Sequence, residues 1–371
     1  MAERADRPRV VLVTGWPGFI GRRLVRGLAR TLDPARDRLV LFTRAPHAEA
    51  ARAELRALRV AGEIAEGDVT RMHLGLSGPE YKGLRAHVTE VWHLAGRYDP
   101  AADADTMRAV NVEGTRHVVE LARAAPGLTR LHHFSTAYVS GDRRGVILEE
   151  ELDAGQGFHD PYERSKFEGE RLVRQAMPEL PATVYRPTIV VGDSRTGEVD
   201  RFDGPYYLAI LLVASPVRVP LPGDGLAPLN VVPVDFVVDA ALAIGANPAA
   251  LGRTVHLADP SPLSTRKVYE LVAARAGRAL SGVALPHRAL EAILGLPVLE
   301  RLARPQRNAI RLANHFAVYN CRNQLDLLAG TGIRCPPITS YLDRLIEFVR
   351  ASHGARPASL PDDVEDPLDV A

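Results

Sequence analysis

The sequence is short of lysine. Its 371 residues include 46 lysines and arginines together, and just three of these, at positions 82, 166 and 267, are lysines. A cation needed for surface charge alone is therefore almost always arginine in this chain. Because the two side chains are not interchangeable where a compact ammonium is required, a lysine inside a patterned segment calls for a chemical explanation.

The chain is also poor in cysteine, in excess charge and in long apolar runs. Its two cysteines, Cys321 and Cys335, form no CxxC pair and have no histidine at metal-ligand spacing, so they predict reduced thiols and no metal site. A formal net charge of +1 gives no general attraction to nucleic acid. The longest apolar run, 206–222, is broken by Pro216 and Arg218 and is too short to cross a bilayer. Without a signal-peptide pattern, we expect a cytoplasmic protein with no transmembrane segment.

Short apolar segments alternate with amphipathic ones over the first two thirds of the chain. This alternation predicts βαβ units and a parallel sheet covered by helices on both faces, an α/β doubly wound fold. The expected strands are 9–15, 38–44, 88–96, 128–139 and 182–192, and the expected helices are 19–32, 48–58, 105–125 and 159–173.

The alternation weakens after about residue 193. We therefore expect a first domain at 1–200 and a smaller, mainly helical substrate lobe at 201–353, with some strands and helices returning to the first domain. The segment 354–371 is acidic and rich in proline, which predicts a disordered tail. The later helices are expected at 205–215, 232–246, 264–277, 285–303 and 338–352, with a strand at 253–259.

A glycine-rich turn joins the first expected strand to the first expected helix. The stretch VTGWPGFIG spaces three glycines as G-x-x-G-x-x-G. Amide groups at a helix N-terminus favour the pyrophosphate of a dinucleotide, and glycine lets the backbone approach it closely. The spacing differs from G-x-G-x-x-G, and the Trp-Pro pair makes the loop bulky. The predicted cofactor-binding turn comprises Gly15, Trp16, Pro17, Gly18, Phe19, Ile20 and Gly21.

The end of the second expected strand indicates which dinucleotide is bound. An NAD site usually has an acidic residue there, but this chain has Thr43 and Arg44. A cation suits a 2′-phosphate, so Arg44 favours NADP over NAD, with Arg22 or Arg23 as further contacts. The alternative is a solvated arginine.

The GDVT stretch follows the third expected strand. It places Asp68 and Val69 where a carboxylate can meet the adenine amino group. Asp68 can equally be a turn residue. Both interpretations stay open from the sequence.

Tyr162 and Lys166 stand four residues apart in an expected helix. This spacing puts the phenol and the ammonium on one helix face. A nearby ammonium lowers the pKa of a tyrosine, which makes the phenol a usable proton donor near neutral pH. The alternative is an exposed lysine beside a half-buried tyrosine. The glycine turn about 140 residues earlier and the scarcity of lysine favour catalysis.

A hydroxyl is expected near this pair, at the end of the preceding strand. Ser135 and Thr136 both offer a hydrogen bond to a carbonyl oxygen that gains charge during reduction. Alternation along a strand turns one of the two towards the cofactor.

The other polar residues and clusters are expected to have structural roles. His132 and His133 are neighbours in a strand, so they face opposite sides and form no simple metal pair. His93 is expected to be structural. The acidic run EEELD at 149–153 predicts a solvated turn.

Together these segments resemble an extended short-chain dehydrogenase/reductase. They occur in family order over about residues 8–200. TGWPGFIG, STAYV and RPTIVVGDSRTGE look most like the acyl-thioester-reducing, male-sterility-type branch, with its fatty acyl-CoA reductases and the terminal reductase domains of carboxylic acid reductases and peptide synthetases. The resemblance rests on TGWPGFIG (14–21), GDVT (67–70), HLAG (93–96), NVEGT (111–115), FSTAYV (134–139), YERSK (162–166) and YRPTIVVGDSRTG (185–197).

This resemblance implies a Rossmann fold with a C-terminal substrate lobe and a catalytic Thr–Tyr–Lys set. It assigns the active hydroxyl to Thr136, with Ser135 as the alternative. The further positions that it implies are Leu94, Ala95 and Gly96 along the cofactor, Asn111 as support for the active-site helix, and Pro187, Thr188 and Ile189 beside the nicotinamide.

The implied activity is hydride transfer from NADPH to the carbonyl of an acyl thioester, held on CoA or on an acyl carrier protein, giving an aldehyde or then an alcohol. The apolar stripes of the second lobe suggest a hydrophobic acyl substrate, although ordinary helix packing explains each apolar residue by itself. One alternative is a ketone, β-hydroxyacyl or sterol-like dehydrogenase. Less favoured are a nucleotide-sugar epimerase or dehydratase and a non-catalytic NADP sensor, which has no need of the Tyr/Lys pair. The fold also allows a homodimer.

Overall fold

The computed structural model describes residues 7–98, 103–200, 221–222, 224–277, 284–285 and 314–354. Its centre is a seven-stranded sheet in the order β11-β7-β5-β4-β1-β2-β3. All neighbouring pairs in this sheet are parallel, which confirms the doubly wound α/β prediction. The strands are β1 (Val10–Thr14), β2 (Arg38–Thr43), β3 (Gly62–Glu66), β4 (Glu90–His93), β5 (Arg130–Phe134), β7 (Ala182–Pro187) and β11 (Thr254–Leu257).

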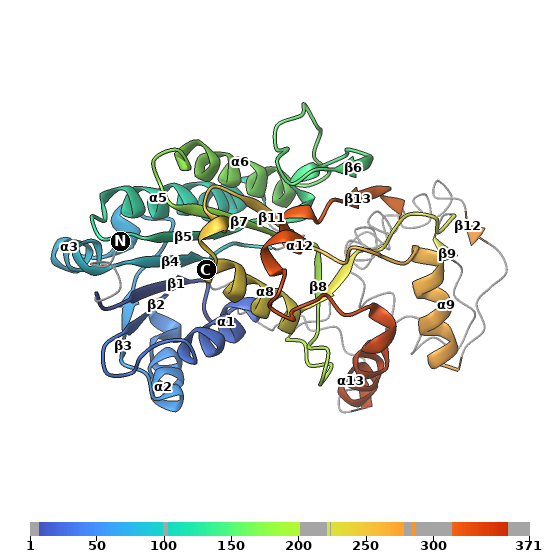
Figure 1. Ribbon diagram of the computed structural model, residues 1–371, viewed down its shortest axis with the longest axis horizontal. Coiled ribbons are helices and arrows are strands. Elements are labelled where there is room, and N and C mark those ends of the chain that lie inside the picture. Colours follow the sequence, from blue (N-terminus) through green and yellow to red (C-terminus); the bar gives the residue numbers. More distant parts are fainter. Residues whose placement is uncertain are drawn as a thin grey trace.

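Helices cover both faces of the sheet, as Figure 1 shows. A separate apolar core lies under each layer, because each helix turns one apolar stripe inward. One layer contains α1 (Phe19–Ala29), α2 (Ala48–Leu58), α8 (Val234–Ala246) and α12 (Arg322–Leu328), and the other contains α3 (Gly78–His87), α5 (Gly114–Ala124) and α6 (Pro161–Ala176).

The single helix predicted at 105–125 is divided in the structure. It consists of α4 (Ala104–Arg108), a wide π-helical turn, η4 (Ala109–Glu113), and α5. Asn111 lies inside the wide turn, and its side-chain amide bonds both the backbone of Arg97 and the hydroxyl of Ser165. These long-range bonds hold the turn open, and the local apolar pattern does not reveal them.

The strand order reverses between β1 and β4. Beyond β1 the chain continues to β2 and β3, and beyond β4 it continues to β5, β7 and β11. In open parallel sheets, ligands bind outside the carboxyl ends of the strands at such a reversal. The glycine turn after β1 lies at this point.

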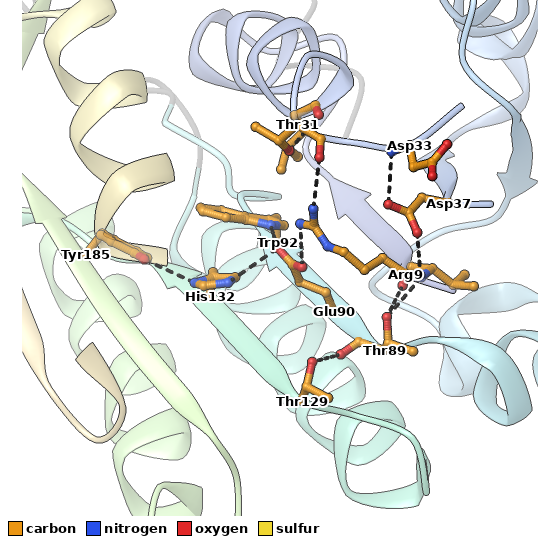
Figure 2. Close-up of polar contacts among 12 residues, drawn as sticks. Arg9, Thr31, Asp33, Asp37, Thr89, Glu90, Trp92, Thr129, His132 and Tyr185 are labelled. Carbon is orange, nitrogen blue, oxygen red and sulfur yellow. Dashed lines mark hydrogen bonds and ion pairs between the residues drawn. The ribbon is translucent and has the colours of Figure 1, made fainter. Parts of the chain in front are cut away.

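A buried polar network starts at the amino ends of β1 and β4 and extends along the sheet to β5 and β7 (Figure 2). Arg9 Nη2 and Trp92 Nε1 donate to Glu90 at 2.9 and 2.6 Å. His132 stacks on Trp92, and its Nδ1 lies 3.0 Å from the hydroxyl of Tyr185. Burial by itself would raise the pKa of Glu90, but His132 and Arg9 lower it to about 2. We call these five residues the amino-end network.

The last third of the chain contributes to two parts of the structure, the main sheet and a second core. β11, α8 and α12 join the main sheet and its covering layer. A second core gathers β8 and β10 with α9, η7 and α13. The elements are β8 (Ile189–Val191), β10 (Val231–Pro233), α9 (Thr265–Arg275), η7 (Ile338–Ser340), α13 (Leu342–Gly354), and the strand pairs β9 (Leu221–Pro222) with β12 (Ala284–Leu285) and β6 (Gly145–Ile147) with β13 (Ala317–Tyr319).

Several expected elements fall outside the described ranges. They are the helix at 205–215, nearly all of the helix at 285–303, and the tail from 355 onward. The helices expected at 232–246, 264–277 and 338–352 correspond to α8, α9 and α13.

The prediction of a solvated acidic turn at 149–153 is wrong for Glu149. Its side chain is fully buried. Its carboxylate accepts hydrogen bonds from the amides of His256, at 2.9 Å, and Asn323, at 2.7 Å. Burial raises the pKa of Glu149 to about 7, against the effect of these bonds. Glu149 therefore ties the loop after β6 to β11 and α12.

Candidate active site

The glycine turn is a close approach of three backbone segments. Gly15 has φ +86°, and a Cβ there would lie 2.6 Å from the amide of Ala95. A Cβ on Gly21 would lie 2.4 Å from the carbonyl oxygen of Gly15. Helix α1 then begins with no side-chain cap and no acidic residue in its first turn. Its first N–H groups are therefore suited to an anion such as a dinucleotide pyrophosphate.

The bulky residues of the turn lie partly inside the protein. Trp16 is buried in the core beneath α1, and its indole Nε1 has no hydrogen-bond partner among the described residues. Pro17 is half-buried behind a cis Trp16–Pro17 bond, and Gly18 caps α1. Phe19 and Ile20 pack on the same core. The orphaned indole N–H is a donor available to a bound group.

The end of β2 carries positive charge next to this turn. The hydroxyl of Thr43 donates to the carbonyl oxygen of Trp16 at 3.4 Å. Arg44 follows, half-buried, and His47 lies one turn on. Burial lowers the pKa of His47, and the charge of Arg44 lowers it further. The positive charge of this corner is suited to an anionic group.

Arg22 and Arg23 are used differently from Arg44. Arg22 pairs with Asp200, and Arg23 lies 3.3 Å from Glu198 and 3.4 Å from Asp200. The guanidinium of Arg23 also stacks on Phe19. Both arginines therefore hold the segment that follows β8 against α1.

Asp68 forms a turn after β3. Its Oδ1 accepts from the amide and the hydroxyl of Thr70, at 2.9 and 2.7 Å. Val69 is buried against Gly114, and its carbonyl lies 2.8 Å from His117 Nδ1. The turn interpretation of Asp68 thus has a structural basis, and its contact with adenine stays a prediction.

The stretch after β4 connects the glycine turn to Lys166. Leu94 packs on the core, and the amide of Ala95 donates to Thr14 Oγ1 at 3.2 Å. A Cβ on Gly96 would lie 3.2 Å from Asn111 Oδ1 and 3.5 Å from Lys166 Nζ. Gly96 therefore lies where the predicted cofactor path reaches the ammonium.

Helix α6 holds Tyr162 and Lys166. It begins after Asp160, whose side chain accepts from the amide of Glu163 at 2.9 Å. Lys166 is 6% exposed and donates to the carbonyl oxygen of Phe134, the last residue of β5, at 2.7 Å. Burial lowers the pKa of Lys166 to about 8, against the charge of Glu170. The ammonium is thus fixed at the carboxyl end of β5.

Tyr162 lies one helical turn before Lys166 and is half-buried. The ring of Tyr98 meets it edge to face, with centroids 4.8 Å apart. Ser165 links the helix to the wide turn η4, because its hydroxyl donates to the carbonyl of Tyr162 and accepts from the Asn111 amide. Tyr98 and Ser165 were not predicted. Ser165 lies inside the YERSK stretch, whereas no sequence pattern marks Tyr98.

The two candidate hydroxyls directly follow Phe134. Both side chains are buried. Thr136 Oγ1 accepts from the amide of Tyr138 at 3.3 Å and keeps its own proton to donate. Ser135 Oγ has no hydrogen-bond partner among the described residues. Either group can donate to a substrate oxygen, so the choice of Thr136 stays a prediction.

The contacts of the segment from Pro187 to Ile189 are mainly structural. Pro187 ends β7 and is buried, and Ile189 begins β8. The hydroxyl of Thr188 donates to Asn230 Oδ1 at 2.9 Å. This bond fixes the crossing from the main sheet to the second core.

His93 and His133 lie on the α6 side of the sheet, with ring centroids 5.4 Å apart. His93 Nδ1 accepts from Thr14, and its Nε2 donates to Thr115, a tautomer assigned from the hydrogen bonds of both threonines. Burial, and then Lys166, lowers its pKa to about 3. Both ring nitrogens of His133 are buried with no partner among the described residues. His132 faces the other side, as expected.

Two further observations concern metal ligands and membrane-spanning helices. Within the described ranges, no three His, Cys, Asp or Glu side chains gather in a way that could hold a metal ion. None of the helices in those ranges is long and apolar enough to span a membrane.

Comparisons with known proteins identify the family and the fold. The sequence profile of the family described as "Male sterility protein" matches residues 13–241. The nonribosomal peptide synthetase asaC of Aspergillus flavus is 30% identical over 274 residues, 68% of this chain and 26% of that protein. The fatty acyl-CoA reductase wat of Drosophila melanogaster is 27% identical over 275 residues, 63% of this chain and 53% of that protein.

The chain therefore spans from about a quarter to about half of these relatives. Among solved structures, the terminal R domain from the myxalamid PKS-NRPS biosynthetic pathway superposes with a TM-score of 0.82 at 26% identity, covering 94% of this chain and 92% of that one. The chain belongs to the male-sterility-type, NAD-binding family of extended short-chain dehydrogenases/reductases.

Proposed function

We propose that this protein reduces an acyl thioester to an aldehyde with NADPH. The observation that carries the proposal is the position of Lys166. Its buried ammonium is fixed on the carbonyl of Phe134, one helical turn from Tyr162 and next to the hydroxyls of Ser135 and Thr136. This arrangement supports a carbonyl-reducing site at the carboxyl end of β5.

Each side chain has one task in this proposal. Thr136, or Ser135 in its place, donates a hydrogen bond to the carbonyl oxygen and stabilises its developing charge. Tyr162 donates the proton that this oxygen receives, and Lys166 favours the phenolate that remains. The reduced nicotinamide supplies the hydride when bound. The resulting hemithioacetal releases its thiol to give the aldehyde, so no enzyme nucleophile is needed.

The preference for NADPH rests on the corner after β2. Thr43 and Arg44 stand where an NAD site of this type usually has a carboxylate. The guanidinium of Arg44 makes this corner positive, and the pKa of the neighbouring His47 is lowered by burial and then by the charge of Arg44. A 2′-phosphate would be bound there by charge-assisted hydrogen bonds.

The relatives support a substrate carried on a phosphopantetheine arm. One is named a fatty acyl-CoA reductase, another a peptide synthetase, and the myxalamid structure is a terminal R domain. We propose that the first 200 residues bind the cofactor and that the segment from 201 to 353 covers the acyl chain. Whether CoA or a carrier protein delivers the chain is an outcome of the experiment.

The test compares three carbonyl types of equal chain length. The protein is incubated with NADPH and, separately, octanoyl-CoA, an octanoyl-loaded carrier protein, octanal or 2-octanone. The expected result is NADPH oxidation with a thioester, release of one thiol for each octanal formed, and loss of this turnover in Tyr162→Phe. Oxidation with 2-octanone alone would replace the proposal with a ketone dehydrogenase. Full turnover in Tyr162→Phe would refute the assigned roles.

A further inference from the structure

The catalytic face of α6 continues beyond Lys166. Glu170 and Arg174 follow at further steps of four residues, so a phenol, an ammonium, a carboxylate and a guanidinium succeed one another along the helix. Glu170 is fully buried, and its Oε1 lies 3.8 Å from Arg174 Nη1. A buried carboxylate is unfavourable unless hydrogen bonds and opposite charge stabilise it.

Arg186 of β7 supplies both. It is 1% exposed, and its Nε and Nη2 donate to both oxygens of Glu170 at 2.6 to 3.1 Å. Its other donors bind the carbonyl oxygen of Glu151, at 2.7 Å, and His256 Nε2, at 3.3 Å. His256 Nδ1 donates to the carbonyl oxygen of Asn320 at 2.7 Å, a tautomer assigned from the network. The imidazole is therefore a neutral hydrogen-bond acceptor, and Glu170 is the charged partner of Arg186.

The groups around Lys166 differ in charge. His93 from β4 and His133 from β5 are neutral at pH 7, because burial and then the ammonium itself lower their pKa values. Tyr162 shares the helix, and η4 contributes the neutral Asn111, whose Oδ1 lies near Gly96. Glu170 lies one helical turn after Lys166 and is fully buried, and its negative charge raises the pKa of the ammonium against the effect of burial.

We propose that Glu170 is a positioning residue for the reaction: its carboxylate is the counter-charge that keeps the buried Lys166 protonated, and Arg186 determines how much of that charge Lys166 experiences. This inference rests on the proposed function, in which Lys166 acts as an ammonium beside Tyr162.

The proposal predicts shifts of opposite sign for the two partners. In Glu170→Gln the ammonium loses its counter-charge while Arg186 and Arg174 remain, so its pKa falls. In Arg186→Met the carboxylate is left to Lys166, so the pKa of Lys166 rises. The double variant removes a nearly neutral pair and restores a value close to that of the unmodified protein. A purely structural role would not produce this pattern of signs.

The scarcity of lysine makes this measurable without a substrate. Lysine isotopically labelled at Cε gives three signals in this chain, and the one missing in Lys166→Met belongs to Lys166. That signal is titrated by NMR in each variant. The matched control is Glu168→Gln, which neutralises a carboxylate of the same helix whose partner is Arg108 at the surface. We expect a fall of about one unit in Glu170→Gln, a rise of about half a unit in Arg186→Met, and no shift in the control.

An unchanged Lys166 titration in Glu170→Gln, or an equal shift in Glu168→Gln, would overturn the inference. If Arg186→Met does not fold, the comparison of Glu170→Gln with Glu168→Gln decides by itself. The alkaline limit of octanoyl-thioester reduction should move in the same direction as the titration. Full turnover in Tyr162→Phe would refute the proposed function and leave the titration result standing, so the two failures are distinguishable.

Discussion

Buried polar groups are paired to different extents at the two ends of the central strands. In the amino-end network, Arg9 and Trp92 both donate to Glu90, and His132 Nδ1 lies next to the hydroxyl of Tyr185 (Figure 2). At the carboxyl ends, Ser135 Oγ and the indole N–H of Trp16 are buried without a partner in the described part of the chain. Folding normally pairs such groups. The amino-end network therefore serves stability, and the carboxyl ends are prepared for a ligand.

Two adjacent residues of β5 show a second contrast, between the two faces of the sheet. His132 stacks on Trp92 at 3.8 Å and lies 3.0 Å from the Tyr185 hydroxyl. His133 points to the α6 side, where neither of its ring nitrogens has a partner among the described residues. Strand alternation by itself sends one imidazole to each environment.

The largest expected effect is at the carboxyl ends, in Lys166→Arg. A guanidinium cannot replace a compact ammonium in the buried site on the Phe134 carbonyl, so turnover should fall about 1,000-fold, within the range of a lost acid–base group. Steady-state NADPH oxidation measures this. The matched controls are Lys82→Arg and Lys267→Arg, which change the two exposed lysines and should keep full activity. Equal losses in all three variants would show that Lys166 has no special role.

The next effect should be confined to the amino ends. Glu90→Gln removes the carboxylate charge to which both Arg9 and Trp92 donate. We expect the free energy of unfolding to fall by about 2 kcal/mol, less than for a fully buried pair because Arg9 is partly exposed. Urea unfolding measures this, with turnover per folded molecule unchanged. The control Glu179→Gln breaks an exposed pair with Arg123 and should cost below about 0.5 kcal/mol.

Acid should affect the same network. The pKa of Glu90 in the folded protein, about 2, lies below its ordinary value of 4.5. The stability that Glu90 contributes is therefore fully present above about pH 4.5 and is lost as the pH falls towards 2. Glu90→Gln should lack this part of the acid dependence. A variant that retains it would show that other carboxylates are responsible.

A smaller effect is expected for the choice of cofactor. Arg44→Ala should lower the preference for NADPH over NADH about 30-fold, because a charge-assisted contact with the 2′-phosphate is lost. The ratio of kcat/KM values for the two cofactors is the measurement. Arg22→Ala, which removes a partner of Asp200, should leave that ratio nearly unchanged. The reverse result would transfer the phosphate contact to Arg22.

The smallest effect compares the two hydroxyls. Thr136→Ala should lower turnover about tenfold and cost about 1 kcal/mol of stability, because its side chain also accepts from the Tyr138 amide. Ser135→Ala removes a buried hydroxyl without a described partner and should leave stability nearly unchanged. A larger loss of turnover in Ser135→Ala would make Ser135 the active hydroxyl.

The fold was predictable because its signals are local. A helix predicted at 48–58 is found at those residues as α2, and the strand predicted at 38–44 is β2. The wide turn η4 was missed because Asn111 is held by Arg97 and by Ser165, the latter 54 residues away. A local pattern carries no record of such bonds.

The site was predictable where its chemistry needs particular residues at fixed spacing, as for Tyr162 and Lys166. Glu149 shows the limit of this approach. Consecutive acidic residues predict a solvated turn, yet Glu149 is buried by partners 107 and 174 residues later in the chain. The Glu170–Arg186 pair was hidden for the same reason, since its two members belong to different elements.

The position of β11 has a consequence for synthesis of the protein. This strand adds residues 254–257 to the outer side of β7, although the residues that resemble the family's motifs end near 200. Until the ribosome has released that stretch, the nascent sheet has an exposed edge at β7, open to pairing with another chain. A fragment cut after residue 200 would keep that edge permanently, so we expect it to aggregate even though it contains every motif.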